Sequence, residues 1–240
     1  MVIQRNVRSW SKSCSTTTHG EAWCRPIKQA QRRFRSELVL QIETEIDELI
    51  EVGFIREAKY LTWIANIVLV KKKNGQIHVY VDFKDLNNAC PKDDFPLPII
   101  ELMVVATIVH EALSFMNGSS GYSQIWMELR DEELVAFRTL KGIYCYKIMH
   151  FGLKNAGATY QHAMQKIFDD MLHKNVECYV DDLVIKSRKR EDHLRDLCMV
   201  FDRLRRCQLK MNPLKCVFGV TSGKFYKVYC STPWHLSGSI

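Results

Sequence analysis

The sequence of 240 residues lacks a long hydrophobic run. Its longest apolar stretch, at residues 63–70, is far shorter than the roughly 18 residues that a membrane helix needs, and the N-terminus has no apolar signal-peptide core. We therefore expect an intracellular protein, cytoplasmic or nuclear, with no membrane partner.

Cysteine patterns of the zinc-binding kind are also missing. The nine cysteines include no C-x-x-C pair and no close Cys/His cluster, and their odd number does not suit a complete disulfide framework. We expect reduced, mostly buried thiols that behave as small hydrophobic side chains.

The net charge of +7 is unevenly distributed along the chain. Residues 1–35 hold eight of the 34 Lys and Arg side chains but only one of the 27 acidic ones, Glu21. Such a basic arm would attract phosphate backbones without reading their sequence. A merely solvated tail explains the same charges equally well, so the charge alone does not establish a nucleic-acid partner.

Residues 1–24 have no apolar periodicity and are expected to form an irregular basic leader. From Ser36, a candidate N-cap, apolar residues recur at helical spacing as far as Ile50, and Gly53 supplies a stop signal. Two β-rich runs, 67–70 and 77–83, flank Asn74-Gly75 and predict a hairpin.

Proline is scarce, with six residues in all, yet three of them fall in 91–98, which predicts an extended segment there. Apolar spacing predicts helices over 158–172 and 193–209. Helices and hairpins thus mix without a repeating βαβ period, which indicates an α+β fold.

Two adjacent acids interrupt an apolar β pattern in residues 176–185, VECYVDDLVI. A hairpin turn at Asp181-Asp182 would explain the backbone alone, since Asp favours turns. The functional alternative is a divalent-metal site, because Mg²⁺ prefers oxygen ligands. Two-metal phosphoryl transfer needs several converging carboxylates, so a further one must come from another strand.

Three motifs carry a resemblance to a known family. Residues 179–182 (YVDD) resemble the YxDD box of reverse transcriptases, and residues 151–161 (FGLKNAGATYQ) are similar to a motif of gypsy-type elements. Upstream, VDFKDLN at 81–87 and PKDDFPLP at 91–98 resemble that family's VDFxDLN and PKDxFPLP signature. The chain thus resembles the reverse transcriptase domain of a gypsy-type LTR retrotransposon polyprotein.

This resemblance implies a right-hand polymerase with fingers and palm, an antiparallel palm sheet packed on helices, and no thumb. Residues 25–225 would form the fingers and palm domain, and residues 226–240 an unrelated tail. The expected partners are an RNA or DNA template with primer and deoxynucleoside triphosphates. In an intact element, RNase H and integrase domains would belong to the same polyprotein.

The resemblance also assigns roles to residues. Asp181 and Asp182 would be catalytic and would bind two Mg²⁺ ions, and Tyr122 would be a steric gate against the ribose 2′-hydroxyl, unless it is simply a core aromatic. The other expected substrate-binding residues are Lys71, Lys72 and Lys73 at the triphosphate, Phe151 and Gly152 at the nucleotide pocket, and Gln161 in its support. Lys215 is a weaker candidate for proton donation, and the three lysines alone would suit a solvated turn.

Two expected site positions depart from the family pattern, and His150 stands where the family has Pro. Asn117 stands where the family has its first catalytic Asp, and His78 stands where it has a triphosphate-binding Arg. An amide carries no formal charge, and a neutral imidazole lacks the guanidinium fork. We expect weakened metal and nucleotide binding and an impaired or inactive enzyme from a degenerate element. The alternative is a non-enzymatic nucleic-acid-binding remnant.

Overall fold

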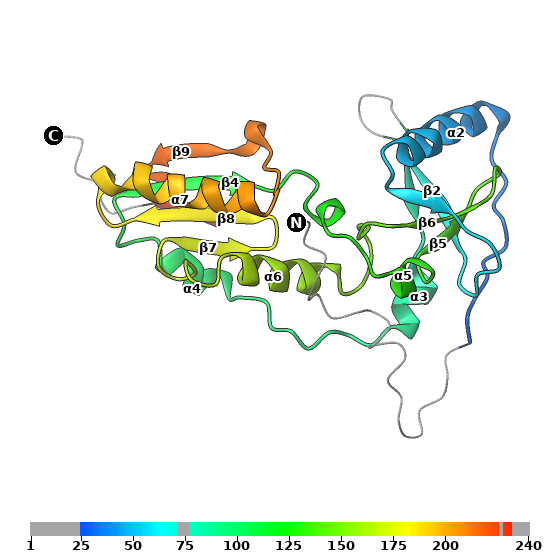
Figure 1. Ribbon diagram of the computed structural model, residues 1–240, viewed down its shortest axis with the longest axis horizontal. Helices are drawn as coiled ribbons and strands as arrows, with labels where there is room; N and C mark the ends of the chain where they lie inside the picture. Colours follow the sequence, from blue (N-terminus) through cyan, green and yellow to red (C-terminus); the bar gives the residue numbers. More distant parts are fainter. Residues whose placement is uncertain (1–24, 72–76, 226–227, 232–240) are drawn as a thin grey trace, which may run out of the picture. The chain divides into compact units, whose positions relative to one another are not determined.

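The computed structural model describes residues 25–71, 77–225 and 228–231, and the chain divides into two compact units. Residues 25–93 and 125–156 form one unit, and residues 94–124 and 157–231 form the other. We call the first the fingers unit and the second the palm unit, after the two parts that the resemblance implies (Figure 1). Both mix helices with antiparallel strands, so the α+β expectation is confirmed.

The fingers unit contains a five-stranded sheet of order β1-β6-β5-β2-β3, in which only β2 and β5 pair in parallel. Its strands are β1 (Ile55–Glu57), β2 (Ala65–Lys71), β3 (Ile77–Val81), β5 (Ala136–Arg138) and β6 (Ile143–Tyr146). Its helices are α2 (Ser36–Glu51), α3 (Lys84–Ala89) and α5 (Leu129–Glu132). The predicted hairpin is confirmed, because β2 and β3 pair from Ile67↔Val81 to Lys71↔Ile77.

Helix α2 confirms the predicted amphipathic helix and corrects its cap. The N-cap is Arg35, which has extended backbone angles and makes no side-chain capping bond, and Ser36 is already the first helical residue. Gly53 follows the helix with φ 77°, the left-handed conformation that a glycine stop provides. The helix buries Ile42 and Ile46 toward the sheet.

The palm unit is built on a four-stranded antiparallel sheet of order β7-β8-β4-β9, with a separate β10-β11 hairpin. Its strands are β4 (Ala112–Asn117), β7 (Val176–Tyr179), β8 (Asp182–Ser187), β9 (Val217–Val220), β10 (Ser222–Phe225) and β11 (Val228–Ser231). Its helices are α4 (Ile100–Val105), α6 (Ala156–Ile167) and α7 (His193–Arg206), with residues 91–99 outside any helix or strand, as expected.

Helices α6 and α7 are shorter than their apolar patterns predicted. Beyond α6, Met171 is still buried, but it lies in a turn, and beyond α7 the chain reverses through Gln208 at φ 56° before burying Leu209. The spacing of apolar residues follows burial, so the apolar pattern continues past the residue at which the hydrogen-bonded helix ends.

Successive side chains of β4 and β8 point to opposite faces of the palm sheet. Leu113, Phe115 and Val184 form a core cluster with Met103 of α4. Phe225 of β10 and Cys230 of β11 belong to the same cluster, so residues beyond 225 contribute to this core. The other face contacts α7, which packs along β8 (Figure 1).

Within the described ranges, no helix has the length and apolar character required to cross a membrane. The seven cysteines of those ranges are free thiols, of which four are buried.

Candidate active site

The acidic pair lies at the connection between β7 and β8. Tyr179 pairs with Asp182, so the two-residue turn is Val180-Asp181 rather than Asp181-Asp182, and Asp182 is the first residue of β8. Val180 has φ 49°. A β-branched residue in this region is strained by about 1–3 kcal/mol and persists only when its surroundings fix it.

Gln161 of α6 supplies that fixation. Its side-chain amide accepts a hydrogen bond from the Val180 N–H at 2.6 Å and donates one to the Cys178 carbonyl at 2.9 Å. The Gln161 side chain is fully buried, so both bonds are shielded from water. Gln161 therefore holds both sides of the turn, a more specific role than general support of a nucleotide pocket.

Asp181 is partly buried against two small residues and an aromatic ring. Its Oδ1 atom is buried and has no hydrogen-bond partner among the residues that the structure describes. A Cβ placed on Gly121 would collide with this Oδ1 and lie 2.9 Å from the Tyr160 hydroxyl, so the glycine leaves the room that the carboxylate occupies. Burial and the neighbouring Asp182 charge raise the pKa of Asp181, while Lys215 opposes them.

Asn117 ends β4 directly opposite the first residue of β8. Asn117 and Asp182 are paired across the two strands, and the Asn117 Nδ2 donates a hydrogen bond to Asp182 Oδ1 at 2.8 Å. Asn117, Asp181 and Asp182 are therefore gathered at one end of the palm sheet. The Asn117 amide thus presents a hydrogen-bond donor to Asp182 Oδ1. An Asp at position 117 would present a third negatively charged carboxylate instead.

Tyr122 lies beside this end of the sheet, in the 3-10 turn Gly121–Gln124. Its ring is 5.6 Å from that of Tyr160, centroid to centroid, at an interplanar angle of 60°. The site thus contains two contacting tyrosines, of which the motif pattern had singled out only Tyr122. Gly118, Gly121 and Tyr160 belong to the same neighbourhood and were missed, although Tyr160 lies inside the 151–161 motif and each glycine adjoins a predicted site residue, Asn117 or Tyr122.

The candidate phosphate-binding residues belong to the fingers unit. Lys71 is the exposed last residue of β2, whereas Lys72 and Lys73 lie outside the described residues. His78 of β3 places its Nδ1 3.3 Å from Glu45 Oε1 of α2, and the other Glu45 oxygen accepts the Val79 N–H at 2.9 Å. His78 is thus engaged with α2.

Phe151 and Gly152 form an exposed turn of the fingers unit. Phe151 is 64% exposed, and Gly152 has φ 95°, which few residues besides glycine adopt. Asn87 of α3 holds this turn, because its Nδ2 donates to the Gly152 carbonyl at 2.8 Å and its Oδ1 accepts the Lys154 N–H at 2.8 Å.

Asn155 performs the same task for the proline-rich segment. Its Nδ2 donates to the Pro91 carbonyl at 2.9 Å and its Oδ1 accepts the Asp93 N–H at 3.0 Å. Asn87 and Asn155 stand inside the recognised motifs, but the spacing of a motif does not reveal which of its residues bind the backbone of another one.

His150, where the family has Pro, packs among aromatic rings of the fingers unit. Its ring lies 4.3 Å from that of Tyr146 and 5.7 Å from that of Phe83, centroid to centroid, and its Nδ1 bonds the Phe151 carbonyl at 2.5 Å. Burial lowers the pKa of His150 to about 4, so the ring is neutral at pH 7.

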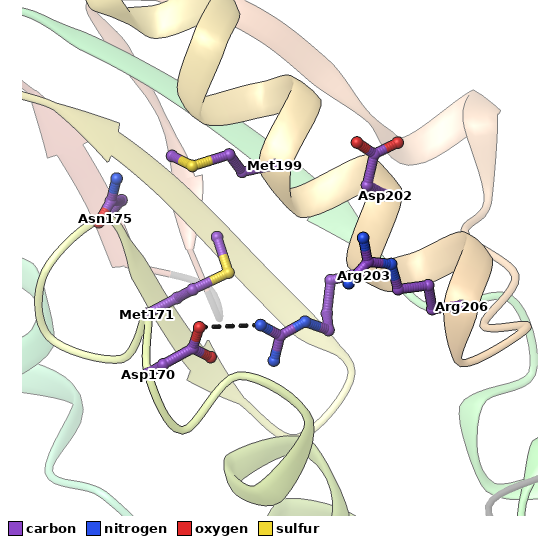
Figure 2. A pocket seen from close by; sticks show the side chains of 7 residues that line it. All are labelled: Asp170, Met171, Asn175, Met199, Asp202, Arg203 and Arg206. Carbon is purple, nitrogen blue, oxygen red and sulfur yellow. Dashed lines mark hydrogen bonds and ion pairs between the residues drawn. The ribbon is translucent and has the colours of Figure 1, made fainter.

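A separate pocket of about 320 Å³ lies in the palm unit between α7 and the connection from α6 to β7 (Figure 2). It is lined by Asp170, Met171, Asn175, Met199, Asp202, Arg203 and Arg206. Arg203 is bound to Asp170 Oδ2 at 2.8 Å, which lowers the pKa of that carboxyl, and Asp202 is bound to Arg205 at 2.8 Å. No residue predicted for catalysis lines this pocket.

Comparison with known proteins decides the family. A family model described as reverse transcriptase (RNA-dependent DNA polymerase) matches residues 70–228, well over half of the chain. The chain belongs to the reverse transcriptase family. This reverse transcriptase domain is 29% identical over 187 residues to the Tf2-3 and Tf2-7 transposon polyproteins of Schizosaccharomyces pombe. The match covers 78% of the chain but only 14% of each polyprotein.

Solved structures show the same fold. The native prototype foamy virus protease-reverse transcriptase superimposes with a TM-score of 0.76 at 19% identity, covering 95% of this chain and 30% of that one. A foamy viral protease-reverse transcriptase in complex with an RNA/DNA hybrid gives a TM-score of 0.75 at 17% identity, covering 90% and 28%. The fold is therefore that of a right-hand polymerase, in its fingers and palm, of the retroviral and LTR-retrotransposon kind.

Proposed function

We propose that this reverse transcriptase domain derives from a gypsy-type LTR retrotransposon and that its ancestral reaction is RNA-directed DNA synthesis. The substrates are deoxynucleoside triphosphates, and the primer 3′-hydroxyl attacks on a template of RNA or DNA. The carrying observation is that Asn117, Asp181 and Asp182 meet at one end of the palm sheet. RNase H and integrase domains belong to the same polyprotein in an intact element.

The residues at this end of the sheet fit a divalent cation in part. Asp181 offers a buried Oδ1 that has no hydrogen-bond partner within the described ranges, and the pKa of its carboxyl is raised. A bound cation would satisfy this oxygen and favour the charged carboxylate. Among the residues that the structure describes, however, no group of three or more His, Cys, Asp and Glu side chains could hold a metal. Asp181 and Asp182 would hold Mg²⁺, with weakened affinity.

Asp181 and Asp182 would hold paired Mg²⁺ ions, whose chemistry would be to activate the attacking hydroxyl and to stabilise the pyrophosphate leaving group. The chain's own contribution is to present Asp181 and Asp182 on a turn that Gln161 fixes. Tyr122, which contacts Tyr160, serves as the gate against a 2′-hydroxyl, and Lys215 is a weaker candidate for protonating pyrophosphate.

The domain is impaired in this reaction because Asn117 replaces a carboxylate. The amide brings no negative charge, and its N–H bond to Asp182 Oδ1 occupies an oxygen that the cation needs. Loss of one oriented electrostatic contributor costs roughly 10²- to 10³-fold in rate. Losing a carboxylate that neutralises metal charge should cost at least about as much.

Nucleotide binding is weakened in the fingers as well. Lys71, Lys72 and Lys73 would contact the triphosphate, and Phe151 and Gly152 would line the nucleotide pocket. His78 cannot provide the guanidinium fork of an arginine, and its Nδ1 faces Glu45 of α2. Two losses of this kind support a degenerate element. Residues 25–225 are its polymerase part, and residues 226–240 are a tail unrelated in sequence, although Cys230 packs in the palm core.

Primer extension tests the proposal. Wild-type protein, Asn117→Asp and the double variant Asn117→Asp/Asp181→Asn are compared on one template-primer with Mg²⁺ and with Mn²⁺. We expect Asn117→Asp to extend the primer at least about 10²-fold faster than the wild type. The double variant should lose this gain, because it again has one carboxylate too few.

Two results would contradict the proposal. Equal extension by wild type and Asn117→Asp would show that Asn117 does not limit the reaction. A folded Asn117→Asp variant that binds template-primer yet never extends it, even with His78→Arg added, would favour the non-enzymatic nucleic-acid-binding remnant.

A further inference from the structure

A buried chain of hydrogen bonds joins four elements of the palm unit, apart from the acidic turn. Ser114 Oγ of β4 lies 2.7 Å from His193 Nε2 of α7, and His193 Nδ1 lies 2.8 Å from Ser187 Oγ of β8. Ser187 Oγ donates to Asp196 Oδ2 at 2.7 Å, and the Gly219 N–H of β9 donates to Ser114 Oγ at 3.0 Å. The four side chains are at most 5% exposed.

The Asp196 end of this chain fixes its direction. Asp196 as a carboxylate can only accept, so it takes the Ser187 hydrogen, and Ser187 Oγ must then accept from His193 Nδ1–H. The Nε2 atom of a neutral His193 is consequently the acceptor of the Ser114 hydrogen. The backbone N–H of Gly219 can only donate, which agrees with the same direction at the other end.

Gly219 occupies an irregularity between β4 and β9. Leu113 pairs with Val220 and Phe115 with Val217, so β9 has one residue more than β4 between these pairs. Gly219 has φ 64° in this bulge, and its N–H bonds a side chain where a regular ladder would offer a carbonyl. Ser114 therefore connects the bulge of β9 to His193.

We propose that this chain is an acid-sensitive clamp, in which neutral His193 holds α7 and the β9 bulge on the palm sheet and protonated His193 loosens them. An imidazolium donates from both nitrogens, so Nε2 no longer accepts the Ser114 hydrogen. That buried hydrogen then has no acceptor among the members of the chain. A buried donor left without a partner destabilises the contacts that hold it.

The surroundings of His193 favour its neutral form. Burial lowers the pKa of His193 more than the Asp196 carboxylate raises it. On α7, Arg195 lies 3.8 Å from the other Asp196 oxygen, whereas β4, β8 and β9 contribute two hydroxyls and one backbone N–H to the chain. Ser114 is fully buried, so this Ser-His-Asp combination cannot attack a substrate.

The sign of the pH effect follows. Because the pKa of His193 is lower in the folded than in the unfolded protein, folding releases a proton at pH values between these two pKa values. The clamp contributes fully above about pH 6.5, and its contribution is lost as the pH falls below that value toward the folded pKa.

Side-chain nitrogen NMR of the full chain tests the direction of the bonds. We expect His193 at pH 7 to be neutral with its hydrogen on Nδ1. An Nε2–H tautomer, or an imidazolium at pH 7, would overturn the proposal. This measurement needs no variant and therefore does not depend on whether a substitution prevents folding.

Amide exchange of Gly219 tests the clamp. We expect its protection factor to fall at least about tenfold between pH 7 and pH 4 in the wild type, and to be similarly low at pH 7 in Ser114→Ala. His193→Gln, which can accept from Ser114 but cannot titrate, should remove the pH dependence. The Val184 amide of β8 serves as the internal control. A Gly219 protection factor insensitive to both pH and Ser114→Ala would refute the clamp.

Discussion

Asn117 determines what the acidic end of the palm sheet can do. In the wild type, the Asn117 amide donates to Asp182 and spares that carboxylate a second like-charged neighbour beside Asp181. Asn in place of Asp at position 117 is thus locally favourable for folding, whereas it is unfavourable for the binding of a cation. Functional sites often show this opposition, because converging charges are held at the expense of stability.

The first prediction concerns this residue and uses stability alone. Asn117→Asp would bring two carboxylates to hydrogen-bonding distance, so without divalent cations we expect a loss of about 1–3 kcal/mol in unfolding free energy. Mn²⁺ or Mg²⁺ should raise the melting temperature of Asn117→Asp more than that of the wild type, because ligands stabilise the state that binds them. Thermal melts with EDTA and with Mn²⁺ provide the measurement.

Asn117→Ala is the matched control for this comparison. It removes the amide without adding charge, so its melting temperature should respond to Mn²⁺ no more than that of the wild type. Identical Mn²⁺ responses in all three proteins would argue against cation binding at this end of the sheet.

His150 gives the second residue-scale prediction. Its pKa of about 4 lies below the ordinary value of about 6.5, so the folded protein resists protonation and stability falls as the pH drops from 6.5 to 4. We expect the loss to be about 2 kcal/mol smaller in His150→Phe, which keeps a ring beside Tyr146 but cannot titrate. Urea unfolding at pH 7 and pH 4.5 measures the difference, and equal losses would contradict the assignment.

At the scale of elements, the β7-β8 hairpin shows how one side chain sustains a strained turn. Val180 at φ 49° is costly by itself, and the two hydrogen bonds of Gln161 are made to the turn's own backbone. Helix α6 therefore orients the acidic pair, since Gln161 is part of it.

The third prediction tests this hold on the hairpin. Gln161→Met keeps the length of the side chain but leaves a buried N–H and a buried carbonyl without partners, so we expect a loss of about 2–4 kcal/mol. Gln165→Met, one turn further along α6, is the control and should stay within about 0.5–1 kcal/mol of the wild type. Urea unfolding monitored by circular dichroism gives both values, and comparable losses would contradict the role of Gln161.

Existence and type of the main elements were predictable, whereas their ends and their polar contacts were not. Ile42 and Ile46 specify the buried face of α2 by spacing alone. The β2-β3 pairing was predicted from the Asn74-Gly75 signal, which itself lies outside the described residues. The end of α7 was misplaced because Leu209 is buried by a turn.

Partners far apart in the sequence explain the remaining gaps. Gln161 meets Cys178 and Val180, and His193 meets Ser114, so neither contact is visible in any local pattern. The YVDD segment predicted the acidic pair, but the bond from Asn117 to Asp182 required the register of β4 and β8.

At the scale of the whole molecule, the net charge of +7 resides in the first 35 residues. Within the described part of this arm, Arg25, Lys28, Arg33 and Arg35 are exposed, while Arg32 contacts Asp82 at 3.1 Å. Exposed basic side chains on an otherwise balanced chain favour contact with phosphates through counterion release.

The last prediction concerns this arm. A variant with Arg25, Lys28, Arg33 and Arg35 all changed to Gln should bind template-primer more weakly. The slope of the logarithm of its binding constant against the logarithm of the salt concentration should become less steep by about 0.9 for each phosphate that the arm no longer neutralises. The control changes four exposed arginines in and beside α7 to Gln, namely Arg188, Arg195, Arg205 and Arg206, which removes the same charge elsewhere.

Fluorescence anisotropy between 50 and 300 mM salt, chosen to span roughly the range over which such interactions weaken, separates the two variants. If the arm binds phosphates, only the first variant changes the slope, whereas a general charge effect lowers both affinities alike. Equal slopes for the wild type and both variants would mean that the arm is merely solvated. Any remaining affinity would then have to come from other surfaces of the reverse transcriptase domain.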